Sequence, residues 1–381
     1  QIPEMVALFN GFGGLASVAV ALSDYWLRTQ VQATGVDVIV GTSAVLSIFI
    51  GGVTFTGSMV AFLKLNGKIS GKPITFTAQH LLNLALFIGV IGVSILAIVD
   101  QYNVNHVLVV TAIALLLGIL TVIPIGGADM PVVISLLNSY SGMAACTTGF
   151  VLNNNVLIVS GALVGASGII LTQIMCKAMN RSLVSVLLGG FGQAPTVAGA
   201  DGPEITVKEV GVEEAAMLFD SASSIIIVPG YGMAVAQAQH TIRELAELCE
   251  KRNISVKFAI HPVAGRMPGH MNVLLAEANV SYDKLIEMEE INDEFANTDL
   301  VFVVGANDVV NPAARTNPQS PIFGMPILNA DKARTVIVSK RSMGKGYAGV
   351  ENELFGYDNC LMLFGDAKQT ITKVVNELKD M

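Results

Sequence analysis

The sequence predicts a bundle of transmembrane α-helices followed by a Rossmann-like α/β domain with a doubly wound parallel sheet. Of the 381 residues, 52% are hydrophobic and only 14% are charged, and the mean hydropathy is +0.61, well above that of soluble proteins. Six apolar segments of membrane-spanning length lie before residue 177. After residue 206, apolar strands alternate with helical patterns, which is typical of a parallel sheet.

The membrane segments define a predicted transmembrane domain over residues 1–181. Each segment is long enough to cross a hydrocarbon core of about 30 Å. Lys64, Lys68 and Lys72 follow the second segment, and Lys177 and Arg181 follow the sixth. Because positively charged loops stay on the cytoplasmic side, we expect the C-terminal domain there, or in the equivalent matrix compartment. The segments are placed at 5–22, 42–63, 81–99, 107–124, 130–151 and 156–176.

Charge and cysteine content exclude several kinds of function. The formal net charge is −8, and most of the acidic excess lies after residue 176. An acidic soluble domain argues against nucleic acid as a partner. The four cysteines include no CxxC pair, so we expect neither a disulfide framework nor a zinc site.

Polar side chains within the apolar segments are candidates for a proton path, because their burial without a partner is costly. Asn10 lies in the first segment, and Asn138 and Ser139 lie in the fifth. For a single Asn or Ser, an interhelical hydrogen bond is the more common role. Asp129 lies in a tight turn ahead of the fifth segment, with Pro131 close behind it. It fits either a helix cap or a proton carrier, and the sequence leaves both open.

A Gly- and Pro-rich linker is predicted over 182–206, and a nucleotide-binding domain over 207–381. Ligands of a doubly wound sheet bind beyond the carboxyl ends of its strands. Strands are predicted at 224–228, 255–260, 300–304, 335–339 and 361–364, with helices at 233–252, 268–278 and 366–379.

The strand ends carry residues that suit a dinucleotide. Gly230 and Gly232 form a Gly-x-Gly turn after the first strand, where free backbone N–H groups at a helix start suit a pyrophosphate. An NAD(H) site usually has an acid after its second strand, but this chain has His261 there. We interpret His261 and His270 as structural residues.

Lys340, Arg341 and Ser342 follow the fourth predicted strand. Two cations and a hydroxyl suit a 2′-phosphate, which favours NADP(H) over NAD(H). The alternative is a solvated surface pair. The sequence shows no nucleophile triad, carboxylate pair or metal-ligand cluster, and a nicotinamide can itself carry hydride chemistry.

Seven strings of the sequence closely resemble the beta subunit of proton-translocating NAD(P) transhydrogenase, and the resemblance runs almost end to end. It implies reversible, proton-pumping hydride transfer from NADH to NADP⁺, directly between nicotinamides and without a catalytic side chain. The implied role of this chain is to bind NADP(H) and to form the proton channel. The strings lie at 126–133, 137–142, 175–182, 229–239, 261–278, 305–314 and 340–350.

The resemblance also implies partners and site residues. An alpha subunit would carry the NAD(H) domain and further membrane helices, and further spans would precede Gln1. A dimer of the alpha–beta unit in a lipid bilayer is implied, in a bacterial inner membrane rather than a mitochondrial one. The implied NADP(H)-site residues are Gly230, Tyr231, Gly232, Met233, Ala234, Val235, Arg266, Gly305, Asn307, Asp308, Lys340, Arg341, Ser342, Gly346 and Tyr347; those for proton coupling are Asp129, Asn138, Asn10, Ser139 and Arg181.

One position departs from the family pattern. Many relatives carry a histidine in the first segment, where this chain has Asn10. Since Asn does not titrate near neutral pH, a histidine relay is excluded at this position. A partner subunit could supply the carrier, or water held by Asn10 and Asn138 could conduct. A function of another class is a channel or transporter gated by a nucleotide-binding domain.

Overall fold

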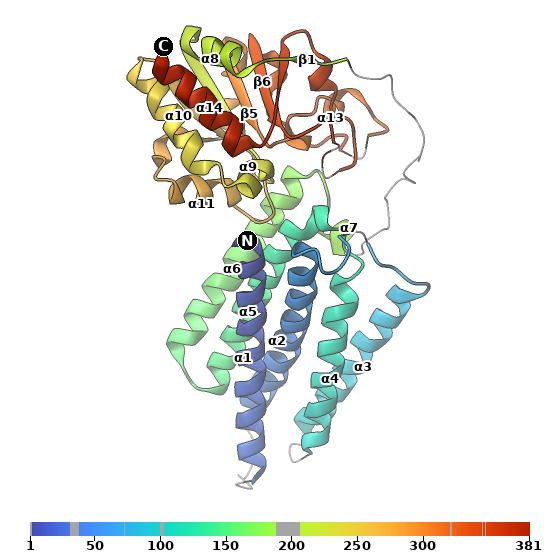
Figure 1. The fold of residues 1–381 in the computed structure, drawn as a ribbon. Coiled ribbons are helices and arrows are strands. Elements are labelled where there is room, and N and C mark those ends of the chain that lie inside the picture. The colour runs from blue at the N-terminus through green and yellow to red at the C-terminus, as the bar shows by residue number, and fades with distance from the viewer. Residues whose placement is uncertain are drawn as a thin grey trace. The chain divides into compact units, whose positions relative to one another are not determined.

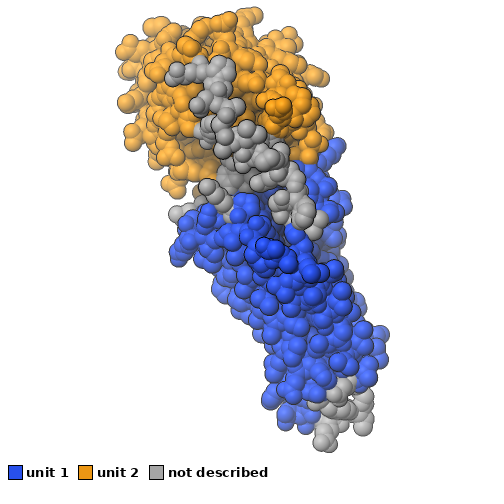
Figure 2. All heavy atoms as spheres, turned by 90° about the vertical axis from the view of Figure 1, so that its right-hand side faces the viewer, with its two compact units in different colours: residues 1–177, 181–192 blue, residues 178–180, 193–381 orange. Residues whose placement is uncertain are grey.

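The computed structural model describes residues 2–30, 38–71, 73–99, 103–187, 206–320, 322–344, 346 and 348–381. The chain divides into two compact units, shown in blue and orange in Figure 2: Gln1–Lys177 with Arg181–Gly192, and Ala178–Asn180 with Gln193–Met381. The predicted linker 182–206 begins with a short helix, and its residues 188–205 lie outside the described part of the chain.

The first unit is helical (Figure 1). Five of its described helices, α1 to α4 and α6, are long and apolar enough to cross a membrane. The fifth predicted segment forms α5, a helix of 22 residues that is not among those five, so its crossing stays a prediction. The bounds are α1 Ile2–Gln30, α2 Val38–Leu65, α3 Gln79–Val99, α4 Val104–Val122, α5 Met130–Val151, α6 Asn155–Ala178 and α7 Leu183–Leu187.

Small residues allow these helices to pack backbone against backbone. A Cβ built on Gly14 of α1 would lie 2.6 Å from the Gly51 carbonyl oxygen of α2. A Cβ on Gly142 of α5 would lie 2.5 Å from the Gly165 nitrogen of α6. Real Cβ atoms do not come so close, so α5 is held tightly against its neighbours.

The second unit contains one seven-stranded sheet, in which all neighbouring strands are parallel. The strand order is β1-β7-β6-β5-β2-β3-β4. From β2 the chain runs outward through β3 and β4, then returns to the other side of β2 for β5, β6 and β7. This is the order of dinucleotide-binding domains, with β1 added at one edge, and its switch point lies between β2 and β5.

The five predicted strands are confirmed to within one residue at each end, whereas the short strands β1 and β4 were not predicted. The strands are β1 Lys208–Glu209, β2 Ser224–Pro229, β3 Ser255–Ile260, β4 Leu285–Glu287, β5 Leu300–Val304, β6 Thr335–Lys340 and β7 Cys360–Phe364. The helices are α8 Val212–Ser221, α9 Tyr231–Ala236, α10 Gln239–Lys251, α11 His270–Glu277, α12 Met288–Ile291, α13 Ala313–Thr316 and α14 Ala367–Asp380.

The prediction of one continuous helix over 233–252 is wrong. The chain ends α9 at Gln237, which adopts a left-handed conformation with φ of 50°. The Gln237 and Ala238 N–H groups donate to the Ala234 and Met233 carbonyls, respectively, and so close the first helix. A new helix, α10, then begins at Gln239.

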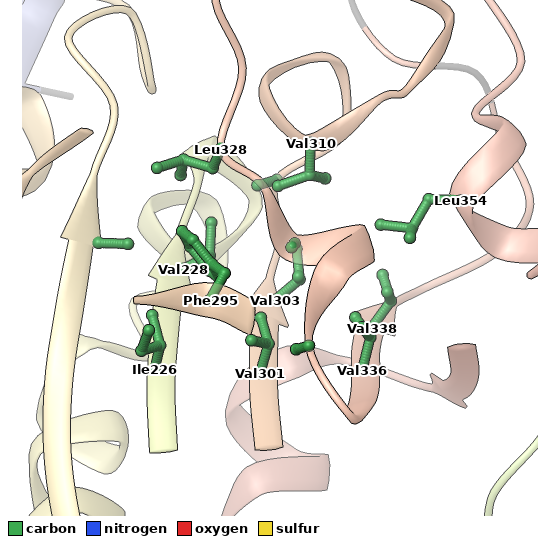
Figure 3. Packing of buried hydrophobic residues seen from close by; sticks show 14 of the residues in the cluster. Ile226, Val228, Phe295, Val301, Val303, Val310, Leu328, Val336, Val338 and Leu354 are labelled. Atoms are coloured by element: carbon green, nitrogen blue, oxygen red, sulfur yellow. The ribbon is translucent and has the colours of Figure 1, made fainter. Parts of the chain in front are cut away.

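The sheet is apolar on both faces, as expected for parallel strands covered on both sides. On one face, side chains of β2, β5 and β6 pack with residues from the connecting segments (Figure 3). On the other, Phe302 of β5 meets Phe219 of α8 edge to face, with ring centroids 5.1 Å apart. The labelled cluster comprises Ile226, Val228, Phe295, Val301, Val303, Val310, Leu328, Val336, Val338 and Leu354. This packing fixes the strand ends from which the site loops leave.

Candidate nucleotide site and buried charged turn

The loops after β2 and β5 join at the switch point through their backbones. The Gly230 N–H donates to the Val304 carbonyl at 2.9 Å, and the Gly232 N–H donates to the Gly305 carbonyl at 2.8 Å. A Cβ on Gly232 would lie 2.7 Å from the Gly305 Cα, and Gly305 itself has φ of +65°. Only residues without a side chain allow this contact.

The predicted site residues on α9, the helix that follows the Gly-x-Gly turn, differ in solvent exposure. Met233 is fully buried in the domain, so its side chain packs in the core and cannot face a ligand in solution. Val235 is 51% exposed, and Tyr231 is half-buried. At this turn the Tyr231 and Val235 side chains are accessible, whereas the Met233 side chain packs beneath them in the core.

The loop after β3 brings a cation to the same turn. The Arg266 guanidinium carbon lies 4.2 Å from the centroid of the Tyr231 ring, which is a cation–π distance. The Arg266 backbone N–H donates to His270 Nδ1 at 3.1 Å. His270 is buried, so it orders the loop from inside.

His261 anchors the start of that loop. Its Nε2 lies 2.9 Å from the Pro326 carbonyl, and its Nδ1 accepts from the Val263 N–H at 3.2 Å. This places the proton of a neutral ring on Nε2. Burial lowers the pKa of His261 to about 4, although the Pro326 bond opposes the shift. The contacts of His261 fit the structural role that we expected for it, and it offers no free acid or base to a ligand.

The loops after β5 and β6 are pinned to each other. Asp308 Oδ2 accepts from the Ala348 N–H at 2.9 Å. Asn352 Nδ2 donates to the Asn307 carbonyl and to Asn307 Oδ1, both at 3.0 Å. A Cβ on Gly346 would displace the ends of the Asn307 and Asp308 side chains. Asn352 was not singled out from the sequence, because nothing in its neighbourhood marks it as a loop tie.

The end of β6 carries the predicted phosphate-binding residues in two different settings. Lys340 Nζ donates to the Gly344 carbonyl at 2.7 Å and lies 4.7 Å from the Phe355 ring centroid. Burial lowers the pKa of Lys340, and the Asp308 carboxylate partly opposes this. Arg341 and Ser342 are exposed. Tyr347, also expected here, lies outside the described residues.

In the helical unit, Asp129 forms an ion pair with Arg181. The Arg181 Nη1 donates to both carboxylate oxygens, at 3.2 and 3.0 Å. Burial raises the pKa of Asp129, and the Arg181 charge partly lowers it. Asp129 stands at the N-cap of α5, but its side chain makes no capping hydrogen bond. The carboxylate is thus used for the ion pair and not for the cap.

The other predicted coupling residues make interhelical contacts. Asn10 Nδ2 of α1 donates to the Ile134 carbonyl of α5 at 3.3 Å, and Ser139 Oγ of α5 donates to the Gly165 carbonyl of α6 at 2.7 Å. Asn138 is half-buried on α5. Within the described residues, no hydrogen bond links these side chains to Asp129 directly. Their contacts fit the packing role, and a proton path through them stays a prediction.

Lys64 supplies a second buried charge at this turn, which the sequence did not predict. Lys64 Nζ donates to the carbonyls of Ile123 and Ile125, at 2.6 and 2.7 Å. In the sequence, Lys64 is one of three lysines that follow an apolar segment, and this pattern does not predict that its side chain turns inward. No group of three or more potential metal ligands lies close together among the described residues.

Comparison with known proteins agrees with this arrangement. Residues 1–377 match the family model described as NAD(P) transhydrogenase beta subunit. The NAD(P) transhydrogenase subunit beta of Rhodospirillum rubrum is 52% identical over 384 residues, which cover 99% of this chain and 82% of the relative. A second Rhodospirillum rubrum sequence of the same name matches with the same values.

The chain belongs to the NAD(P) transhydrogenase beta-subunit family. The predicted family, fold class and enzyme class are therefore confirmed, and the channel or transporter alternative is not favoured. Transhydrogenases bind NAD(P)(H), and a beta subunit implies an alpha subunit as its partner. The five apolar helices fit a membrane protein of this family.

Replacing Gly232 with alanine is expected to weaken the contact between the loops after β2 and β5 by about 1–3 kcal/mol, the usual cost of overpacking. Gly211→Ala is the matched control, because a Cβ there meets nothing within 4 Å. Hydrogen exchange of the β2 and β5 amides in the full chain measures the effect. Equal exchange rates in the two variants would show that the backbone contact is dispensable.

Proposed function

We propose that this chain is the NADP(H)-binding and proton-conducting subunit of a transhydrogenase that transfers hydride reversibly between NADH and NADP⁺, coupled to proton movement. The observation that carries the proposal is the glycine contact at the switch point between β2 and β5. Ligands of doubly wound sheets bind at such a point, and glycines, which have no side chain, let a ligand come close to the backbone there. The bound nicotinamide would supply the hydride chemistry.

The residues around the switch point fit a dinucleotide. Gly230 and Gly232 with the start of α9 would cradle the pyrophosphate, and Arg266 would neutralise it from the loop after β3. Ala234 and Val235 would border it on α9. On the opposite side, the loop that carries Gly305, Asn307 and Asp308, tied to Gly346, would form the second wall.

The choice of NADP(H) over NAD(H) rests on the ends of β3 and β6. After β3, the position of the usual ribose-binding acid holds His261, whose ring nitrogens are already engaged. After β6, Arg341 and Ser342 are exposed and Lys340 is close behind them. A guanidinium can bind a 2′-phosphate with two parallel hydrogen bonds. Lys340 would contribute charge from its present position over Phe355.

The proton would be handled at Asp129. A carboxylate that is buried, raised in pKa and paired with a single arginine can change its charge closer to neutral pH than an exposed one. Protonation would weaken the bond to Arg181, which follows α6. Asn10, Asn138 and Ser139 would line or hydrate the path on α1 and α5.

The remaining assignments concern the assembly. The alpha subunit would carry the NAD(H) domain together with further membrane helices, and two alpha–beta units would form a dimer in the bilayer. Lys68 and Lys72 after α2, with Lys177 in the last turn of α6 and Arg181 after it, favour a cytoplasmic or matrix location for the C-terminal domain. We propose a bacterial inner membrane rather than a mitochondrial one.

Removing the exposed guanidinium is expected to weaken NADPH binding. The loss of a charge-assisted phosphate contact costs about 1.5–3 kcal/mol, which is roughly ten- to a hundredfold in affinity. Titration of the full chain with NADPH and with NADH compares wild type and Arg341→Ala. Arg334→Ala is the control, because Arg334 precedes β6 at its other end and is an exposed ion-pair partner of Asp299. Equal NADPH and NADH affinities in wild type, or no loss in Arg341→Ala, would contradict the assignment.

Asp129→Asn separates a proton carrier from a purely structural partner of Arg181. Asn keeps an oxygen that can accept from Arg181 but does not titrate, so a structural role predicts nearly normal proton pumping. The carrier role predicts that pumping collapses while NADPH binding persists. Proton uptake by vesicles that contain both subunits is the measurement. Asp24→Asn, which breaks the ion pair with Arg28 on α1, is the control and should pump normally.

A further inference from the structure

The turn between α4 and α5 gathers an unusual pair of charges. Among the described residues, Lys64 and Asp129 are the only Lys, Arg, Asp or Glu residues that are buried, with 4% and 7% of their surface exposed. Both act on the same short turn, residues 123–129, from opposite ends. Burying a charge is costly unless it is well paired, and an apolar residue at position 64 would avoid that cost. The placement of Lys64 therefore needs an explanation beyond packing.

Lys64 forms hydrogen bonds with the start of this turn. Its ammonium donates two short hydrogen bonds, to the Ile123 and Ile125 carbonyls, at 2.6 and 2.7 Å. Ile123 is the C-cap of α4, where unpaired carbonyls and the negative end of the helix dipole favour a cation. Charge-assisted bonds of this kind are stronger than those between neutral groups.

Other contacts hold the same turn at its remaining positions. The Ile74 N–H donates to the Ile123 carbonyl at 3.3 Å, and the Gly127 N–H donates to the Gly71 carbonyl at 2.9 Å. At the end of the turn, Asp129 meets Arg181. Residues 123–129 are thus held from three sides: by the last turn of α2, by the segment after it and by Arg181 after α6. The contact from α2 is the charged side chain of Lys64.

We propose that Lys64 is a positioning residue for proton coupling. Its ammonium fixes the α4–α5 turn so that Asp129 stays buried and aligned with Arg181. The inference rests on the proposed role of Asp129 as proton carrier. Within the described part of the chain, two other charged or titratable groups face Asp129: the Arg181 guanidinium, and the Cys176 thiol of α6, which interacts with it electrostatically.

A purely structural lysine would behave differently. It would change the amount of folded protein but leave the pH dependence of turnover alone. Positioning predicts a change in that dependence, because burial is the main cause of the raised Asp129 pKa. If the turn loosens, water reaches the carboxylate and its pKa falls. The acidic limb of the pH profile then moves to lower pH.

The test uses the complete alpha–beta complex in proteoliposomes. Lys64→Met should lower the number of protons moved per hydride, because the turn no longer holds Asp129 in line with Arg181. It should also move the acidic limb of the pH profile to lower pH. NADPH binding should be unchanged. Lys64→Arg, which keeps charge and donors, should restore most of the coupling. Lys68→Met, at an exposed lysine just after α2, is the control and should resemble wild type.

A wild-type proton ratio and pH profile in Lys64→Met would overturn the inference, as would an equal defect in Lys68→Met. If Lys64→Met does not assemble, Lys64→Gln is measured against the same two expectations. Asp129→Asn in the same preparation distinguishes failure of the carrier role of Asp129 from failure of the positioning role of Lys64. Normal pumping in that variant removes the carrier role itself, whereas loss of pumping there with normal Lys64→Met removes only the role of Lys64.

Discussion

The direct contact between two backbones at the switch point of the sheet is the constraint on which the proposed nucleotide site depends. Gly232 and Gly305 approach so closely that any side chain would separate them. Because the loops after β2 and β5 are joined there, the loops after β3 and β6 can be arranged around a fixed edge. The apolar strands beneath hold that edge in place (Figure 3). The site is thus built from backbone geometry first and from charged side chains second.

The helical unit follows a different principle, because two buried charged residues stand in an otherwise apolar bundle. Small residues bring α5 against its neighbours. The turn before the N-terminus of α5 carries the Asp129–Arg181 ion pair and accepts the hydrogen bonds of the Lys64 ammonium. A change in protonation there alters an ion pair that links this turn to the end of α6. Such an ion pair is a suitable element for passing a proton signal along the chain.

The sequence predicted the parallel sheet well, because its long strands are continuous apolar runs that end at glycines or at polar residues. It missed β4, since three residues carry too little pattern, and it missed the helix break at Gln237, where good helix formers hide a left-handed residue. The inward turn of Lys64 had no signal at all. For the site, residue types at strand ends predicted which loops would face a ligand, but only the structure separates the buried Met233 from the exposed Val235.

The central claim is that this chain supplies one nucleotide site of a two-subunit hydride transfer. The most direct test purifies the chain alone and together with its alpha subunit, and measures NADPH binding and NADH-to-NADP⁺ turnover in both preparations. The account predicts NADPH binding in both, but turnover only when the alpha subunit is present. Robust turnover by this chain alone would contradict it.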